Sequence, residues 1–143
     1  MSDQARLGAC HRTSLRVRYE ETDAMGVVYY GNYFTWFEVG RTELMRTIGY
    51  PYRRMEEEGY RMMVVDAFCK YRAPCRYDQE VAVENWIGDV KNTSVLFEHR
   101  VVVEGKVAAE GRTTLVLADR SFSPVKLPEA FKKALLSYRP ESA

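Results

Sequence analysis

The sequence predicts an α+β fold in which one long helix packs on an antiparallel sheet of about five strands. Three observations lead to this prediction. Apolar and charged residues alternate over Ser14–Glu20, the period becomes helical between Tyr30 and Ile48, and four strand-like segments follow with short connections. With 143 residues the chain is long enough for one core, so we expect a single domain over 1–143.

The first strand is expected over Ser14–Glu20, after a loose polar lead-in at 1–11. Its alternation places Leu15, Val17 and Tyr19 on one face, which is typical of a half-buried strand. We therefore expect the Tyr19 ring to pack in the core, with its hydroxyl as an alternative means of orienting a neighbouring catalytic group.

The helix is expected from about Tyr30 to Ile48, with apolar residues at helical spacing. Asn32 is the expected N-cap, and Gly49 is expected just beyond the C-cap in a left-handed conformation. Gly40 costs about 1 kcal/mol relative to Ala within a helix. Its presence therefore indicates the close approach of a sheet or of another chain.

The remainder is mainly β, after a short helical turn at Arg53–Glu58. The expected strands are 60–73, 79–88, 93–104 and 106–119, and a C-terminal helix is expected over 128–138. Open sheet edges in a Tyr-rich protein favour pairing between subunits.

Composition excludes several classes of function. A net charge of +1 gives no global electrostatic basis for binding nucleic acid or an anionic membrane. No apolar run approaches the roughly 20 residues of a membrane span. Cys10, Cys69 and Cys75 are irregularly spaced and far from His11 and His99, so we expect no metal site and a reducing, cytoplasmic location.

Asp23 lies in a Gly-containing loop directly before the long helix. A helix N-terminus offers free N–H groups and a positive dipole end. A carboxylate that attacks or activates water, together with donors that hold an oxyanion, can hydrolyse an activated carbonyl. The structural alternative is that Asp23 only makes an Asx turn or caps the helix.

The run Tyr19–Tyr33, continued by Trp36–Glu38 and Arg41–Glu43, resembles the 4-hydroxybenzoyl-CoA thioesterase-like family. These are hotdog-fold acyl-CoA thioesterases, and they include a branch associated with the Tol-Pal cell-envelope system. The likeness extends from about Leu15 to Leu127, through the Lys91–Ser94 turn. It implies a five-stranded antiparallel sheet wrapped around the helix, dimers joined edge to edge, and active sites at the subunit interface.

The resemblance places the catalytic carboxylate on Asp23 and the oxyanion donor on the backbone N–H of Tyr30. Gly31 is expected to offer a second N–H at the helix start. Some members, including the envelope-associated branch, have His where this chain has Tyr30, whereas Tyr19 matches that branch. The acyl group therefore stays open, as does the choice between Asp23 as a nucleophile and as a general base.

Other polar residues are expected to have structural roles. Glu20 and Glu21 are interpreted as solvated charges, and Glu38 and Arg41 as an ion pair at i, i+3 spacing. His99 faces the apolar side of its strand, which favours a core or interface histidine.

Contacts with the phosphates or pantetheine of CoA are expected from the turn between two strands and from one lysine near the C-terminus. The candidates are Lys91, Asn92, Thr93, Ser94 and Lys126.

The leading hypothesis is hydrolysis of an acyl-CoA thioester without a metal or an organic cofactor, by a homodimer or homotetramer. An acyl carrier protein thioester is the alternative substrate. The competing functions are a non-catalytic hotdog dimer that binds acyl-CoA or an acyl carrier protein, and a hotdog dehydratase or hydratase.

Overall fold

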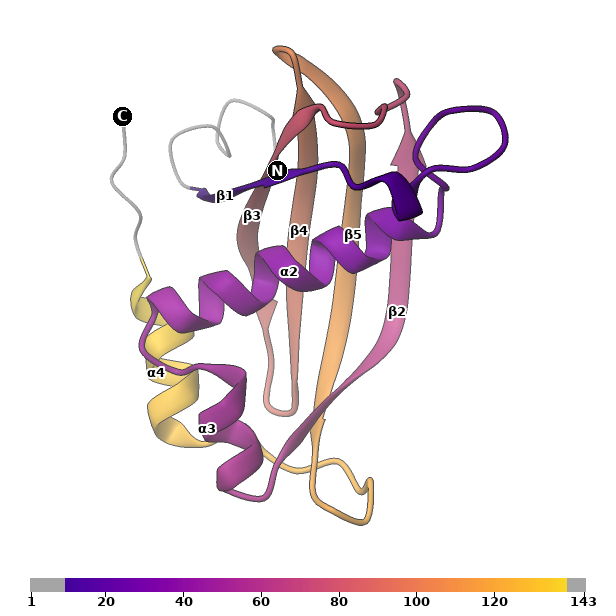
Figure 1. Ribbon diagram of the computed structural model, residues 1–143. Coiled ribbons are helices and arrows are strands. Elements are labelled where there is room, and N and C mark those ends of the chain that lie inside the picture. The colour runs from indigo at the N-terminus through magenta and orange to yellow at the C-terminus, as the bar shows by residue number, and fades with distance from the viewer. Residues whose placement is uncertain (1–9, 139–143) are drawn as a thin grey trace.

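The computed structural model describes residues 10–138 and confirms the α+β prediction. Five antiparallel strands form one sheet in the order β1-β3-β4-β5-β2. The strands are β1 (His11–Arg16), β2 (Arg61–Tyr71), β3 (Glu80–Val90), β4 (Ser94–Val103) and β5 (Lys106–Ala118). The long helix α2 (Asn32–Thr47) crosses one face of this sheet (Figure 1).

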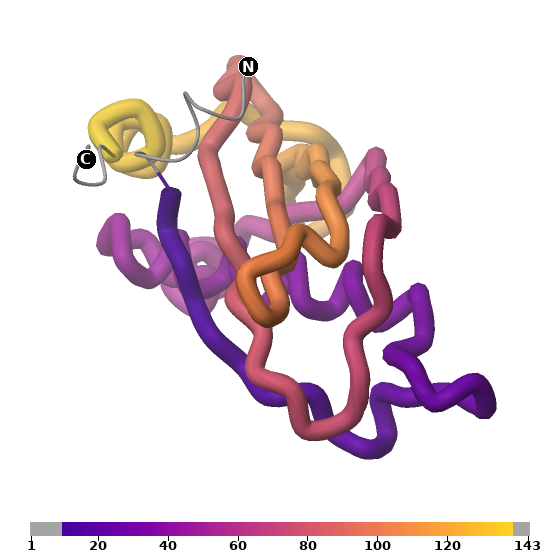
Figure 2. Tube along the Cα trace, turned by 90° about the horizontal axis from the view of Figure 1, so that it is seen from above, coloured from indigo at the N-terminus to yellow at the C-terminus, as the bar shows by residue number. Residues whose placement is uncertain are grey.

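Three shorter elements complete the described part of the chain. The 3-10 turn η1 covers Tyr19–Glu21, α3 covers Tyr52–Glu57, and α4 covers Glu129–Ser137. The loop between η1 and α2 lies at one end of the molecule, whereas α4 lies at the other (Figures 1 and 2). Of the lead-in predicted over 1–11, residues 1–9 fall outside the described residues, and His11 belongs to β1, so the prediction is wrong at its end.

The predicted end of the first strand is wrong. β1 stops at Arg16, and the chain turns into η1 where Tyr19 was expected to continue the strand. Val17 keeps one ladder-like bond, from its N–H to the Gln79 carbonyl at 2.9 Å. The alternating pattern therefore persists beyond the residues that the sheet pairs.

The start of α2 also differs from the prediction, whereas its end does not. Gly31 occupies the N-cap position and Asn32 is the first helical residue. At the other end Gly49 has φ +83°, and the Tyr50 N–H donates to the Met45 carbonyl at 3.0 Å. These two features form a Schellman motif, and the predicted left-handed conformation of Gly49 is confirmed.

Gly40 allows α2 to approach the sheet directly. A Cβ at this position would overlap the side-chain amide of Asn85 on β3. Asn85 is fully buried and in turn contacts His99. The core consists of two apolar clusters, one around Trp36 and Phe37 and one around Leu44 and Phe131. The small residue therefore serves contact with the sheet.

Candidate functional site

Asp23 begins a tight turn that projects from the sheet. Its N–H donates to the Val27 carbonyl, and the Gly26 N–H donates to the Asp23 carbonyl, both at 2.9 Å. Gly26 has φ +79°, a conformation that glycine adopts without strain. One carboxylate oxygen of Asp23 accepts the Met25 N–H at 2.9 Å, so the Asx contact expected as the structural alternative is present. This contact also fixes the direction of the carboxylate.

Glu21 anchors this loop to α2, and its interpretation as a solvated charge is wrong. Its carboxylate is buried and accepts the Arg18 N–H at 2.8 Å and the Trp36 indole N–H at 2.9 Å. Its carbonyl accepts the Tyr29 N–H and the Asn32 side-chain amide, each at 2.8 Å. The sequence shows no sign of this role, because the indole that binds Glu21 lies fifteen positions away.

Two backbone donors, the N–H groups of Tyr30 and Gly31, directly precede the first helical residue of α2. The Tyr29 carbonyl accepts the Asn32 N–H at 2.9 Å, and the Tyr30 carbonyl accepts the Tyr71 hydroxyl at 2.8 Å. Within residues 10–138 neither the Tyr30 N–H nor the Gly31 N–H has an acceptor. Such N–H groups at a helix start can bind an anionic oxygen.

Tyr19 does not pack in the core. Its side chain is 77% exposed, because η1 turns it out of the strand, and its ring meets Tyr77 edge-on at 5.7 Å. Among the described residues no hydrogen bond links the Tyr19 hydroxyl to Asp23. Its alternative role in orienting Asp23 stays a prediction.

Asp23 and Tyr30 line one surface cavity of 330 Å³. Tyr33 forms part of its wall with Tyr71 from the end of β2, and Pro74 belongs to the following loop. The lining of the cavity therefore combines an acidic residue, a residue next to the helix start and several tyrosines. This is a suitable setting for an apolar or aromatic group beside a reacting carbonyl.

The candidate CoA-contacting residues lie at the end of the sheet opposite the cavity. Ser94 pairs with Val116, which pairs with Met63, whereas the cavity is next to Tyr71. At ~3.3 Å per residue, Met63 and Tyr71 on β2 are roughly 26 Å apart. One chain does not bring them together with Asp23.

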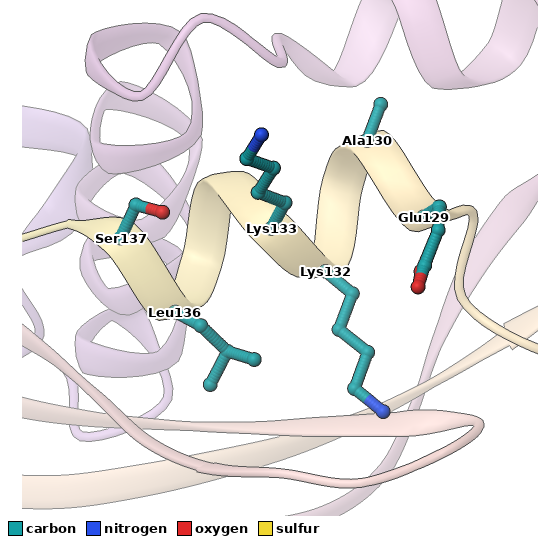
Figure 3. Close-up of a pocket in the computed structure, with 6 residues that line it drawn as sticks. All are labelled: Glu129, Ala130, Lys132, Lys133, Leu136 and Ser137. Atoms are coloured by element: carbon teal, nitrogen blue, oxygen red, sulfur yellow. The ribbon is translucent and has the colours of Figure 1, made fainter.

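Within that distant end the candidates do cluster. Lys91, Asn92, Thr93 and Ser94 form the β3–β4 turn, and the Asn92 carbonyl accepts the Leu127 N–H at 2.8 Å, directly after Lys126. A separate hollow of 440 Å³ runs along α4 and contains none of the candidate residues (Figure 3).

His99 was expected to be a core or an interface histidine, and the structure places it in the core. It is fully buried between Asn85, 2.8 Å from Nδ1, and Thr113, 2.9 Å from Nε2, and its ring stacks on Phe37. Burial lowers the pKa of His99 to about 3, and the positive charge of Arg41 acts in the same direction. A neutral ring held on both nitrogens has no free nitrogen for the acid–base role that a hydratase requires.

Arg41 does not form the predicted ion pair with Glu38 within the described part of the chain. It is half-buried against Tyr52, Met62 and Glu38 in a small cavity of 160 Å³. Burial lowers the pKa of Arg41, and the nearby Glu38 carboxylate partly opposes that effect.

None of the helices within residues 10–138 has the length and apolar character needed to cross a bilayer. In the same residues, no group of three or more His, Cys, Asp or Glu side chains is arranged to hold a metal ion.

Comparison with known proteins shows that this chain is similar to one family. Residues 17–135 match the thioesterase-like superfamily. The putative acyl-CoA thioesterase YneP of Bacillus subtilis is 34% identical over 84% of this chain and 88% of its own length. The acyl-CoA thioester hydrolase YbgC of Escherichia coli O6:H1 is 31% identical over 88% of this chain and 92% of its own.

A solved structure agrees with these relatives. The DHNA-CoA thioesterase of Staphylococcus aureus superimposes with a TM-score of 0.81 and 33% identity, over 82% of this chain and 80% of that one. The sheet order and the long helix are those of the hotdog fold that such thioesterases share. On the match over 17–135 and the identities above 30%, this chain belongs to the thioesterase-like superfamily.

Proposed function

We propose that this protein hydrolyses acyl-CoA thioesters, with Asp23 as the nucleophile or general base and the Tyr30 and Gly31 N–H groups as the oxyanion hole. One observation carries the proposal: Asp23 and Tyr30, which directly precedes the N-cap of α2, line the same cavity. Asp23 would attack the thioester carbonyl or take a proton from the attacking water. The two N–H groups would stabilise the oxygen as it becomes negative.

The first test is release of thiol from short-chain, long-chain and aromatic acyl-CoAs, and from acyl carrier protein thioesters. Asp23→Asn is expected to lower kcat by at least ~10²-fold, as for a lost general base. Glu20→Gln is the matched control, since Glu20 is an exposed neighbouring carboxylate paired with Arg18. Saturable CoA binding without thiol release would indicate a binding module instead.

A second measurement detects nucleophilic attack by Asp23. If Asp23 attacks the carbonyl, single turnover in ¹⁸O-labelled water leaves the label in the product acid or, after hydrolysis at the aspartyl carbon, in the Asp23 carboxylate. Mass spectrometry of the Asp23 peptide detects the second case, which general-base catalysis does not produce.

We infer that the protein assembles as a homodimer through β2, with a homotetramer as the larger alternative. β2 pairs only with β5 in the described sheet, so its outer edge is open. Val64, Val65 and Phe68 on this strand are 49%, 56% and 44% exposed. A long apolar edge strand is a template for pairing with another chain. Light scattering of wild type and of Val65→Lys tests this inference: wild type is expected to be at least dimeric, and the variant to dissociate.

Antiparallel pairing of two β2 edges would bring the Lys91 end of one chain toward the Asp23 end of the other. The proposed contacts of Lys91 and Lys126 with CoA phosphates depend on this arrangement. Lys91→Gln is expected to raise KM for acyl-CoA without changing kcat, and to leave turnover of the N-acetylcysteamine thioester, which lacks the phosphates, unchanged.

The thiols of Cys10, Cys69 and Cys75 are free, which supports a reducing cytoplasmic location.

A further inference from the structure

Tyr71, the last residue of β2, reaches across to the start of α2. Its hydroxyl donates to the Tyr30 carbonyl at 2.8 Å. Its ring packs edge-on against Tyr30 and Tyr33, with centroid distances of 6.3 Å and 5.1 Å. A side chain from the sheet therefore holds one backbone carbonyl of the helix start. The Tyr33 N–H also donates to this carbonyl, at the longer distance of 3.4 Å.

The hydrogen bond from Tyr71 also controls the opposite side of the peptide group. The Tyr30 carbonyl and the Gly31 N–H belong to one planar trans peptide, so they point in opposite directions. The preceding peptide is held in the same way, since the Tyr29 carbonyl accepts the Asn32 N–H. Two successive N–H groups, those of Tyr30 and Gly31, are thus fixed through the carbonyls behind them.

We propose that Tyr71 is a positioning residue for the oxyanion hole: its phenol orients the Tyr30–Gly31 peptide so that the Gly31 N–H faces the substrate carbonyl oxygen. This role rests on the proposed thioesterase activity. A donor on the carbonyl also polarises the peptide, which makes the N–H on the other side a stronger donor.

The phenol is suited to this role because it keeps its proton. Burial raises the pKa of Tyr71, and contact with the Cys69 thiol adds to the rise. The hydroxyl therefore stays a hydrogen-bond donor throughout the neutral and mildly alkaline range.

The kinetic test compares Tyr71→Phe with wild type. The variant keeps the ring contacts and loses only the hydroxyl. We expect kcat to fall about tenfold with KM within twofold, because the oxyanion forms only in the transition state and complete loss of a donor costs 10²–10³-fold. Tyr77→Phe is the matched control: it removes an exposed phenol that has no hydrogen-bond partner within residues 10–138, so its kcat should equal that of wild type.

The second readout does not depend on activity. In ¹H–¹⁵N spectra, Tyr71→Phe is expected to shift the Gly31 amide and to speed its hydrogen exchange, whereas Tyr77→Phe leaves both unchanged. An unchanged Gly31 amide and an unchanged kcat in Tyr71→Phe, beside an active wild type, would overturn the positioning role and leave the thioesterase proposal intact.

Two other outcomes would also refute the role. A several-fold rise in KM would make Tyr71 a substrate contact, and a displaced alkaline limb of the pH profile would make it a proton donor. If wild type releases no thiol from any thioester, the proposed function fails and this role fails with it, whatever the amide spectrum shows.

Discussion

The carboxylate of Glu21 accepts the indole N–H of Trp36 at 2.9 Å, which ties the start of the Asp23 loop to the second turn of α2. Both groups are buried. The Glu21 carbonyl also holds Tyr29 and Asn32, so one residue connects the loop to the helix start through side chain and backbone together. The relative placement of Asp23 and the two free N–H groups therefore depends on Glu21.

Replacing Glu21 by Ala is expected to destabilise the fold by about 2–3 kcal/mol, because the Trp36 and Arg18 N–H groups lose their acceptor in a buried site. Glu21→Gln should cost less, since one oxygen remains to accept. Urea unfolding measures both changes. Glu20→Gln, exposed one position earlier, should change the free energy of unfolding by less than about 0.5 kcal/mol. Equal effects of the two Gln variants would contradict the anchoring role.

Substitution of the two residues at the helix start should affect kcat differently. Tyr30→Phe keeps the backbone donor, so kcat should stay within about twofold of wild type. Gly31→Pro removes an N–H that has no acceptor in the described structure, at φ −65°, which suits proline. We expect kcat to fall by about 10²-fold in this variant.

Gly31→Ala is the control for the proline variant, since its Cβ meets only the edge of the exposed Tyr29 ring at 3.0 Å. Circular dichroism checks that each variant is folded. A folded Gly31→Pro with wild-type kcat would exclude the Gly31 N–H and leave the Tyr30 N–H as the donor.

These residues show how far the sequence can predict the site. Local spacing was sufficient for the sheet, for the helix and its Gly49 ending, and for a loop carboxylate placed before a helix. It could not predict Glu21–Trp36 or Tyr71–Tyr30, because each depends on a contact between segments whose packing is set by the whole fold. The prediction that Tyr19 packs in the core was wrong for a related reason. The alternation of apolar and charged residues continues to Tyr19, but η1 turns the chain before the sheet can pair this residue.

Gly40→Ala should have two opposite effects on the free energy of unfolding, a gain in helix propensity and a loss in packing against the sheet. Alanine favours the helix by about 1 kcal/mol over glycine. Its Cβ, however, overlaps the Asn85 amide that holds His99, and overpacking of this kind costs about 1–3 kcal/mol, beyond the loss of a buried hydrogen bond. We expect a net loss of stability in thermal or urea unfolding. Thr35→Ala on the exposed face of α2 should instead be neutral or slightly stabilising; a stabilised Gly40→Ala would show that Asn85 moves freely.

His99 should make stability fall as the pH is lowered. The folded protein holds the pKa of His99 at about 3, below the ordinary value of 6.5, because the ring is buried. Between these values the unfolded chain binds a proton that the folded chain does not, so the free energy of unfolding decreases as pH falls below about 6.5. From pH 7 to pH 5 the loss from this residue is about 2 kcal/mol.

His99→Gln isolates that contribution, because an amide can still hydrogen-bond Asn85 and Thr113 but does not titrate. Urea unfolding of wild type and variant at pH 7 and pH 5 is the measurement. The variant is expected to be less stable at pH 7, since it loses the ring stacked on Phe37. Its stability should nevertheless fall less between the two pH values than that of wild type. Carboxylates that titrate in both proteins contribute equally and cancel in the comparison. Identical pH dependence in the two proteins would mean that His99 takes up a proton in the folded state as readily as in the unfolded chain, and hence that its buried contacts do not hold it neutral.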